Sequence, residues 1–264
     1  MRTLLSPLFI CLTLPLSFNA NAVKPHTDTD NSKQASIISI PAFTAKYTLL
    51  HKSSPVGTAL RQLTYVNNQN KQLDSKSAVY HYETDIEWLI FSDKRSETST
   101  LTIQNNKVIP KHYIYKREGT GRDKSYEWHY DFIKKIATDE KSHRQVKLDQ
   151  IEGLQDKLSY HLQNRLDLIN QSSNKAMQKR FSYPVISTSG NIKNYDYEYD
   201  GEEELILPYG LVKTIRLKRE IAEKKRITYA WFAPELNYVL VKLYQVKSGA
   251  EQFEAQLSHL EMIK

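Results

Sequence analysis

The stretch SYEWHYDF, residues 125–132, alternates polar and aromatic residues without a fault. Tyr126, Trp128, Tyr130 and Phe132 are its aromatic residues, and Ser, Glu, His and Asp stand between them. Because successive side chains of a β-strand point to opposite faces, the stretch predicts a strand with one aromatic and one polar face. The aromatic face is either packed core or the wall of a cavity for an apolar ligand, and both interpretations stay open.

Similar alternating runs fill most of the chain from Ile38 onward, separated by turn-like clusters such as SSPVG, NNQN, GTGRD and APEL. Short strands joined by short turns are typical of an antiparallel meander. The sequence therefore predicts a mainly β protein, built as a large curved antiparallel sheet or open β-barrel. Residues 86–103 are expected to form two pieces, 124–137 one strand, and 192–200 and 203–207 two separate strands.

One segment has a helical period instead. In DQIEGLQDKLSYHLQNRLDLIN, residues 149–170, leucines recur every four residues from 154 to 166, and an isoleucine follows at 169. This stripe predicts one amphipathic helix over about 150–170, packed on the sheet. Asp149 and Glu152 have the spacing of an N-cap followed by a capping glutamate.

The first residues have the features of a targeting signal. Arg2 precedes an apolar run that ends at the small-residue pattern Ala20-Asn21-Ala22, so 1–22 is expected to be a signal peptide that is cleaved near Ala22. The polar residues 23–37 are expected to form a disordered leader, and 38–264 a single β-rich domain. Cys11 is the only cysteine of the chain. The expected product is a periplasmic protein with neither a disulfide nor, after cleavage, a transmembrane segment.

The charge balance is basic, with a formal net charge of +7 that falls to +6 without Arg2. Export argues against nucleic acid as the partner. Anionic membrane surfaces or envelope polymers are the acidic neighbours that such a charge could meet, although ordinary solubility also explains it.

Tyrosines form further ladders, among them Tyr195 and Tyr197 in NYDYEYD, and the chain contains 17 of them. A tyrosine buries its ring while its hydroxyl seeks a partner, so inward-facing tyrosines suit a partly wet concave face. The candidate ligand-binding wall therefore comprises six residues: Tyr126, Trp128, Tyr130, Phe132, Tyr195 and Tyr197. A polar stripe on the predicted helix, with Asp156, Ser159 and Gln163, could contact a ligand at the rim, fix the helix, or face water.

No pattern in the sequence indicates catalysis or a cofactor. The eight histidines are dispersed, without a pair at metal-ligand spacing on one element, so we expect no metal. GTGRDKS lacks the spacing of a phosphate-binding loop and is expected to be a hairpin turn. Lys, Arg and Glu interrupt both faces of most strands, unlike the lipid-facing set of a membrane barrel.

Several phrases taken together resemble a known family: PKHYIY (110–115), YDF (130–132), GLQDKLSYHLQNRLDL (153–168), LPYGLVKT (207–214) and YAWFAPELNYVLVK (229–242). In this order they resemble the Gram-negative periplasmic family known as domain of unknown function 3108, over about residues 43–262. Leu240 stands where the family often has proline. The resemblance implies a periplasmic location and a β-rich fold, and it supplies no catalytic residues. The implied shape is similar to carriers in which a curved sheet wraps around helical cover, a likeness of fold only.

Two functional hypotheses follow. The first is a non-enzymatic binding or carrier module that holds a lipid-like, apolar or amphipathic envelope component against the aromatic face. The alternative is a structural component of the envelope that engages another envelope protein through sheet edges and tyrosine-rich faces. An enzyme ranks behind both, because the sequence shows no activated nucleophile or metal set.

Overall fold

In the computed structural model of the chain, the described residues are 39–66, 75–149, 151–172 and 178–263. The expected signal peptide (1–22) and leader (23–37) lie outside them. The described residues fall within one compact unit, residues 37–264.

The alternating segments form the strands of a single fourteen-stranded sheet, in which every neighbouring pair is antiparallel. Strands make up 69% of the structure. The prediction of a large antiparallel sheet is confirmed. The strands are β1 (Ala42–His51), β2 (Ser54–Tyr65), β3 (Ser75–Trp88), β4 (Phe91–Gln104), β5 (Lys107–Gly119), β6 (Lys124–Asp131), β7 (Ile136–Asp139), β8 (Gln145–Lys147), β9 (Arg180–Ile186), β10 (Ile192–Leu207), β11 (Gly210–Ile221), β12 (Arg226–Ala233), β13 (Val239–Lys247) and β14 (Ala250–Ile263).

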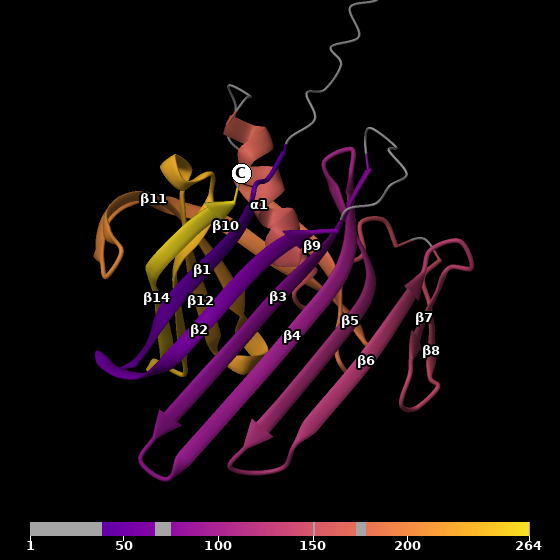
Figure 1. Cartoon of the computed structure of the whole chain (residues 1–264), viewed down its shortest axis with the longest axis horizontal. Helices are drawn as coiled ribbons and strands as arrows, with labels where there is room; N and C mark the ends of the chain where they lie inside the picture. The colour runs from indigo at the N-terminus through magenta and orange to yellow at the C-terminus, as the bar shows by residue number, and fades with distance from the viewer. Residues whose placement is uncertain (1–38, 67–74, 150, 173–177, 264) are drawn as a thin grey trace, which may run out of the picture. The chain divides into compact units, whose positions relative to one another are not determined.

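The strands form two meanders, which are joined at the centre of the sheet. One runs from β1 to β8, the other from β9 to β14, and the pairing of β1 with β14 connects them. The sheet does not close on itself, so β8 and β9 are its two edges. Figure 1 shows the sheet curling so that β9 to β12 lie behind the front strands β2 to β5.

The curled sheet encloses the helix α1 (Ser159–Ser172). Leu162 and Leu166 pack in the cluster that contains core residues of β1 to β7, whereas Tyr160 and Leu168 pack in a second cluster with residues of β9 to β13. The helix is therefore contacted from both meanders. Each fully buried leucine contributes about 1.5–3 kcal/mol to the free energy of burial.

The helix begins later than the sequence predicted, at Ser159 rather than near residue 150. Asp156 is the capping residue, because its Oδ1 accepts from the backbone N–H groups of Leu158 (2.7 Å) and Ser159 (2.6 Å). The expected cap at Asp149 and Glu152 is wrong, and the exposed Glu152 instead pairs with Lys107 at 2.9 Å.

The residues before the helix bridge the gap between the two meanders. The backbone N–H of Gln155 donates to Pro184 O (2.8 Å), and its carbonyl accepts from Ile186 N (3.0 Å), a parallel bridge to the edge strand β9. Its side-chain Nε2 donates to Val108 O of β5 at 2.8 Å. Gln163 on the helix completes the connection by accepting from Val108 N at 2.7 Å. These hydrogen bonds fix the helix across the open side of the sheet.

Of three strand boundaries expected from the sequence, one is confirmed and two differ in the structure. Residues 86–103 do form two pieces, separated at Leu89 and Ile90, where β3 turns into β4. The expected strand 124–137 is interrupted by a turn at Phe132–Lys135, so Phe132 lies outside β6. The two expected strands 192–200 and 203–207 are one strand, β10. Its register shifts between Tyr199 and Glu202 around Gly201, whose φ of 115° few other residues adopt.

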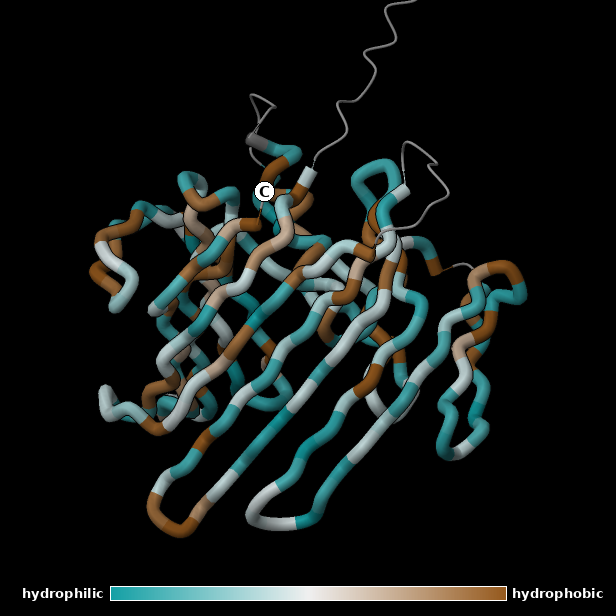
Figure 2. Tube along the Cα trace, viewed as in Figure 1, coloured by the Kyte–Doolittle hydropathy of each residue, from teal (hydrophilic) through white to brown (hydrophobic). Residues whose placement is uncertain are grey.

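The tip of the β3–β4 hairpin exposes four consecutive apolar residues. Leu89 and Ile90 are each 87% exposed, Phe91 54% and Trp88 47%. Figure 2 shows the same end of the hairpin in hydrophobic colours on an otherwise largely hydrophilic or neutral set of front strands.

Among the described residues, no helix has the length and apolar character needed to cross a bilayer.

Candidate functional site

The aromatic face of the opening stretch lies on the inner side of the sheet. Trp128 and Tyr130 are buried in the larger hydrophobic cluster, at 1% and 5% exposure, and Tyr126 and Phe132 are partly buried against it. The guanidinium of Arg144 lies 5.7 Å above the Trp128 ring. None of these four side chains lines either of the two inner cavities described below.

The tyrosines of β10 lie on the opposite wing of the sheet, close to the start of the helix. Tyr197 is buried, lines an inner cavity, and has its hydroxyl 3.4 Å from that of Tyr160. Tyr195 packs beneath Arg219, whose guanidinium carbon is 3.5 Å from the ring centre. The structure thus separates the six candidate wall residues into a β6 group in the core and a β10 group beside the cavity.

The predicted polar rim of the helix fixes the helix itself. Asp156 and Ser159 cap it, with Asp156 Oδ2 accepting from Ser99 Oγ at 2.5 Å and both residues fully buried. Gln163 bonds to β5 and donates to Asp167 at 2.8 Å. Burial raises the pKa of Asp156 to about 6, although the hydrogen bonds from Ser99, Ser159 and Leu158 oppose the shift.

An inner cavity of about 180 Å³ lies at the beginning of α1, enclosed by strands of both meanders. The lining combines aromatic rings, small residues and cations, and none of the described residues that form it is acidic. The lining residues are Tyr47, Ala59, Arg61, Tyr82, Tyr160, His161, Tyr197, Arg219, Thr228, Leu240, Leu243, Gln245, Phe253 and Ala255.

Arg61 brings a guanidinium to this cavity from β2, at 7% exposure. Its Nη1 donates to Tyr80 Oη at 3.4 Å, and its Cζ lies 5.0 Å from the centre of the Tyr82 ring. Within the described part of the chain, neither Arg61 nor Arg219 forms an ion pair with a carboxylate, which contrasts with the paired Arg216 on the other face of β11. The cavity therefore holds positive charge that the protein leaves unbalanced.

Arg165 adds a third guanidinium from the helix, beside a small void of about 10 Å³ that shares Tyr47, Arg61, His161 and Leu240 with the larger cavity. It is 3% exposed, and its Nε donates to Asn237 O at 2.8 Å. Neither its Nη1 nor its Nη2 has a hydrogen-bond partner among the described groups. Burial lowers the pKa of Arg165 to about 10, because desolvation penalises the charged guanidinium.

His161 completes the cationic side of the cavity without adding charge at neutral pH. Burial lowers the pKa of His161 well below its usual value, and the nearby Arg61 and Arg219 guanidiniums lower it further. The imidazole is therefore a neutral donor or acceptor in the wall. Two further lining residues are bonded to each other, because the Tyr47 hydroxyl donates to Leu240 O at 2.8 Å.

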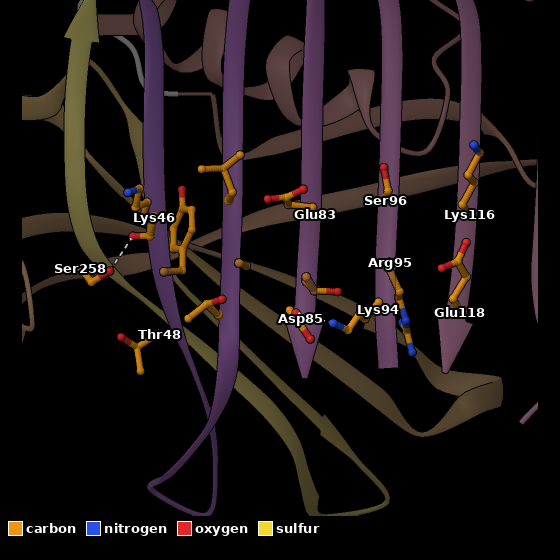
Figure 3. A pocket seen from close by; sticks show the side chains of 15 residues that line it. Lys46, Thr48, Glu83, Asp85, Lys94, Arg95, Ser96, Lys116, Glu118 and Ser258 are labelled. Carbon is orange, nitrogen blue, oxygen red and sulfur yellow. Dashed lines mark hydrogen bonds and ion pairs between the residues drawn. The ribbon is translucent and has the colours of Figure 1, made fainter. Parts of the chain in front are cut away.

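A second, larger hollow of about 550 Å³ lies on the outer face of β1 to β5 (Figure 3). Its lining mixes four basic residues with three acidic ones, namely Lys46, Lys94, Arg95 and Lys116 with Glu83, Asp85 and Glu118. Lys94 pairs with Asp85 at 3.0 Å, and such an exposed pair contributes little. Although it is smaller, the inner cavity is the better candidate, because the described residues of its lining include two arginines without an ion pair and no acidic residue.

The two arginines of the cavity and Arg165 beside it were not among the residues that the sequence singled out, although a signal for each was present. Arg61 falls in the inward register of β2 with Ala59 and Leu63, and Arg165 lies seven residues after Leu158 on the helix stripe. Arg219 likewise follows the inward-facing Leu217 at a spacing of two. A charged residue at a position that the apolar pattern assigns to the interior is the signal to look for.

These features define a class of protein: an open, β-barrel-like antiparallel sheet that surrounds one helix and a cationic inner cavity. The chain belongs to the family described as Protein of unknown function (DUF3108), whose model matches residues 43–256. The resemblance seen in the sequence is thereby confirmed. No curated protein matches the chain.

Two solved structures are similar to the chain. A β-barrel-like protein of domain of unknown function DUF1849 from Brucella abortus has a TM-score of 0.55 at 10% identity, over 86% of this chain and 100% of that chain. A Bacteroides fragilis protein with a YmcC-like fold has a TM-score of 0.35 at 9% identity, over 84% of this chain and 97% of that chain. The first likeness establishes the fold and carries no function with it.

Proposed function

We propose that this protein is an exported, non-enzymatic binding or carrier module of the cell envelope. Its inner cavity holds the anionic head of an amphipathic molecule. The observation that supports this most is that Arg61 and Arg219 line the inner cavity and Arg165 lines the adjoining small void, with no carboxylate among the described lining residues of either.

The energetic argument concerns unpaired buried charge. Removing a guanidinium from water is costly unless a counter-charge and hydrogen-bond acceptors replace the solvent. Within the described part of the chain, Arg165 has one acceptor for its Nε and none for its Nη atoms. A carboxylate or phosphate would supply both the negative charge and the acceptors, and guanidinium groups suit such oxyanions geometrically.

The dimensions of the cavity restrict what enters it. At about 30 Å³ for each water in the liquid, 180 Å³ corresponds to about six water molecules. This space accommodates a headgroup with a few methylene groups, and a longer tail would have to extend through the mouth. Phe253, Leu243 and the tyrosine rings in the wall would contact the first apolar atoms.

The periplasmic location in this proposal rests on the amino-terminal sequence. Arg2, the apolar run and the Ala20-Asn21-Ala22 pattern together have the order of a secretory signal. An envelope compartment also provides anionic amphiphiles as possible ligands, in line with the basic balance of the chain.

Native mass spectrometry of the protein purified from its own periplasm tests the proposal. We expect a co-purifying anionic mass of amphiphile size that is present in the wild type and in Arg122→Gln, and reduced in Arg219→Gln. Arg122 is an exposed turn residue, so its variant removes the same charge without changing the cavity. A clean apo mass for the wild type, or equal retention by the two variants, would contradict the proposal.

A second function, engagement of another envelope protein, is favoured by the exposed apolar tip Trp88–Phe91. Sheet edges offer less support, because β8 has only three residues and Gln155 covers part of β9. If the tip is an interface, a photo-crosslinking residue at Leu89 should give one discrete adduct in cells. The adduct should disappear in Ile90→Ser and be missing when the crosslinker is placed at Ile133, an exposed apolar residue of a different turn. Equal labelling from both positions would indicate nonspecific contact.

A further inference from the structure

Two histidines meet on the outer face of the sheet, away from the inner cavity. His112 of β5 and His129 of β6 are directly opposite each other in the antiparallel register. Their rings stack with centres 4.0 Å apart and an angle of 13° between their planes. Glu127 lies two residues before His129, so its side chain points to the same face.

The ligand atoms of these three residues all lie within 4.8 Å of one another. The Nε2 of His112 is 2.8 Å from Oε1 of Glu127, and the Nε2 of His129 is 4.0 Å from the same oxygen. Both imidazole nitrogens therefore approach one point beside the carboxylate. Around Zn²⁺, ligand atoms at about 2.0–2.2 Å in tetrahedral directions lie about 3.3–3.6 Å apart, a value between the two observed spacings.

A possible fourth ligand, the carboxylate of Glu140, lies nearby. The backbone N–H of Glu140 donates to Glu127 O at 2.9 Å, which places Glu140 next to the cluster at the end of β7. Its Oε1 is 3.6 Å from Nε2 of His129. The side chains of the four residues are between 26% and 48% exposed, so an ion could reach them directly from solvent.

We propose that His112, Glu127 and His129 form a binding site for a divalent transition-metal ion of the Zn²⁺ type, with Glu140 or water as the fourth ligand. Two imidazole nitrogens favour such an ion over Mg²⁺ or Ca²⁺, which prefer sets of oxygen ligands. The carboxylates offset the charge of the ion. The bound ion would connect β5, β6 and the end of β7, close to the free edge β8. This site is separate from the inner cavity and does not depend on the proposed function.

Calorimetric titration of the full exported protein, without a histidine tag and freed of metal with EDTA, tests the site. With ZnCl₂ we expect one equivalent bound for each wild-type chain, and at least about tenfold weaker binding for His129→Ala and for Glu127→Gln. MgCl₂ should give no comparable binding. CoCl₂ should give the visible absorption of a tetrahedral ion in the wild type but not in His129→Ala or Glu127→Gln.

His81→Ala is the matched control, because His81 lies on the outer face of β3 beside a single glutamate, with Nε2 3.4 Å from Glu83, and has no second histidine opposite. Its affinity for zinc should equal that of the wild type. Zinc should also raise the melting temperature of the wild type and of His81→Ala, but not that of His129→Ala. Zinc binding that is unchanged in both His129→Ala and Glu127→Gln, or a wild type that binds zinc no better than magnesium, would overturn the proposal.

Discussion

The guanidinium of Arg165 lies 4.7 Å above the ring of Phe43, so the buried cation of the helix rests on an aromatic residue of β1. This contact gives the charge a favourable electrostatic environment on one side only. The Nη atoms remain without hydrogen-bond partners among the described groups, and Arg165 is one of the residues that line the small void beside the cavity. Arg165 is thus held in place by Phe43 and Asn237 while its charge stays available to a ligand.

Replacing Arg165 by Met should separate stability from binding. Methionine has a similar length and no charge to desolvate, so the free energy of unfolding should be unchanged or about 1 kcal/mol higher. Binding of an anionic amphiphile should fall at least about tenfold, since one charge-assisted contact disappears. Urea unfolding and ligand titration measure the two effects. A variant that is much less stable yet binds normally would assign Arg165 a structural role.

The charge of the ligand head should decide affinity in the inner cavity. Octanoate and 1-octanol have the same chain length and differ in the anionic group, so calorimetry of the pair isolates the charge. We expect octanoate to bind at least about tenfold more tightly, as expected for a hydrogen bond to a charged group worth about 1.5–3 kcal/mol. The preference should shrink in Arg219→Gln and persist in Arg122→Gln. Equal affinities for both compounds would show that the arginines do not contact the head.

Trp128 tests the assignment of the β6 aromatic face to the core. The side chain is 1% exposed, and its removal in Trp128→Ala should lower the free energy of unfolding by about 3–5 kcal/mol. His129→Ala, on the outer face of the same strand, should change it by less than about 0.5 kcal/mol when EDTA is present. A small loss at Trp128 together with reduced ligand retention would instead place a cavity wall at β6.

Asp156 should make stability depend on pH between about 4 and 7. Its folded-state pKa is raised to about 6 by burial, from 3.8, so its contribution is fully present below pH 3.8 and is lost as the pH rises through 6. A shift of this size corresponds to roughly 3 kcal/mol. Asp156→Asn keeps an acceptor for the cap and cannot titrate. It should therefore gain stability relative to the wild type as the pH rises from 4 to 7.

Urea unfolding of both proteins at several pH values measures this difference. His161 has the opposite tendency, because its pKa is lowered in the folded state. Its contribution to stability is present above pH 6.5 and is lost as the pH falls. Both proteins retain His161, so its effect cancels in the comparison. A constant difference between Asp156→Asn and the wild type across the range would contradict a raised pKa at Asp156.

The strands were predictable because each carries its own signal. The alternation of 125–132 appears in the structure as buried Trp128 and Tyr130 with exposed His129, and GTGRD is the turn between β5 and β6. The helix boundary was not predictable from the leucine stripe. Leu154 and Leu158 are buried by contacts that precede the helix, so apolar spacing continues where the backbone is not helical.

The candidate site could be predicted less well, because its residues come together only through the curl of the sheet. Tyr197 was proposed from its ladder and does line the inner cavity. Its neighbours across the cavity, Arg61 and His161, lie on β2 and α1, and no local pattern connects them to β10. The outer pair of His112 and His129 was not predicted for the same reason, because the two residues are neighbours only through the β5–β6 register.

The pairing of β1 with β14 also bears on the order in which the chain can fold. Ala42 pairs with Ile263 and Leu50 with Glu254, so the centre of the sheet joins segments more than 200 residues apart. Contacts of such high sequence separation form slowly, because a large loop must close before they can stabilise anything. A ribosome-bound chain cannot assemble this centre until β14 has been synthesised. The hairpins of β1 to β8 need only local contacts, whereas the joint between the two meanders waits for the last strand to be made.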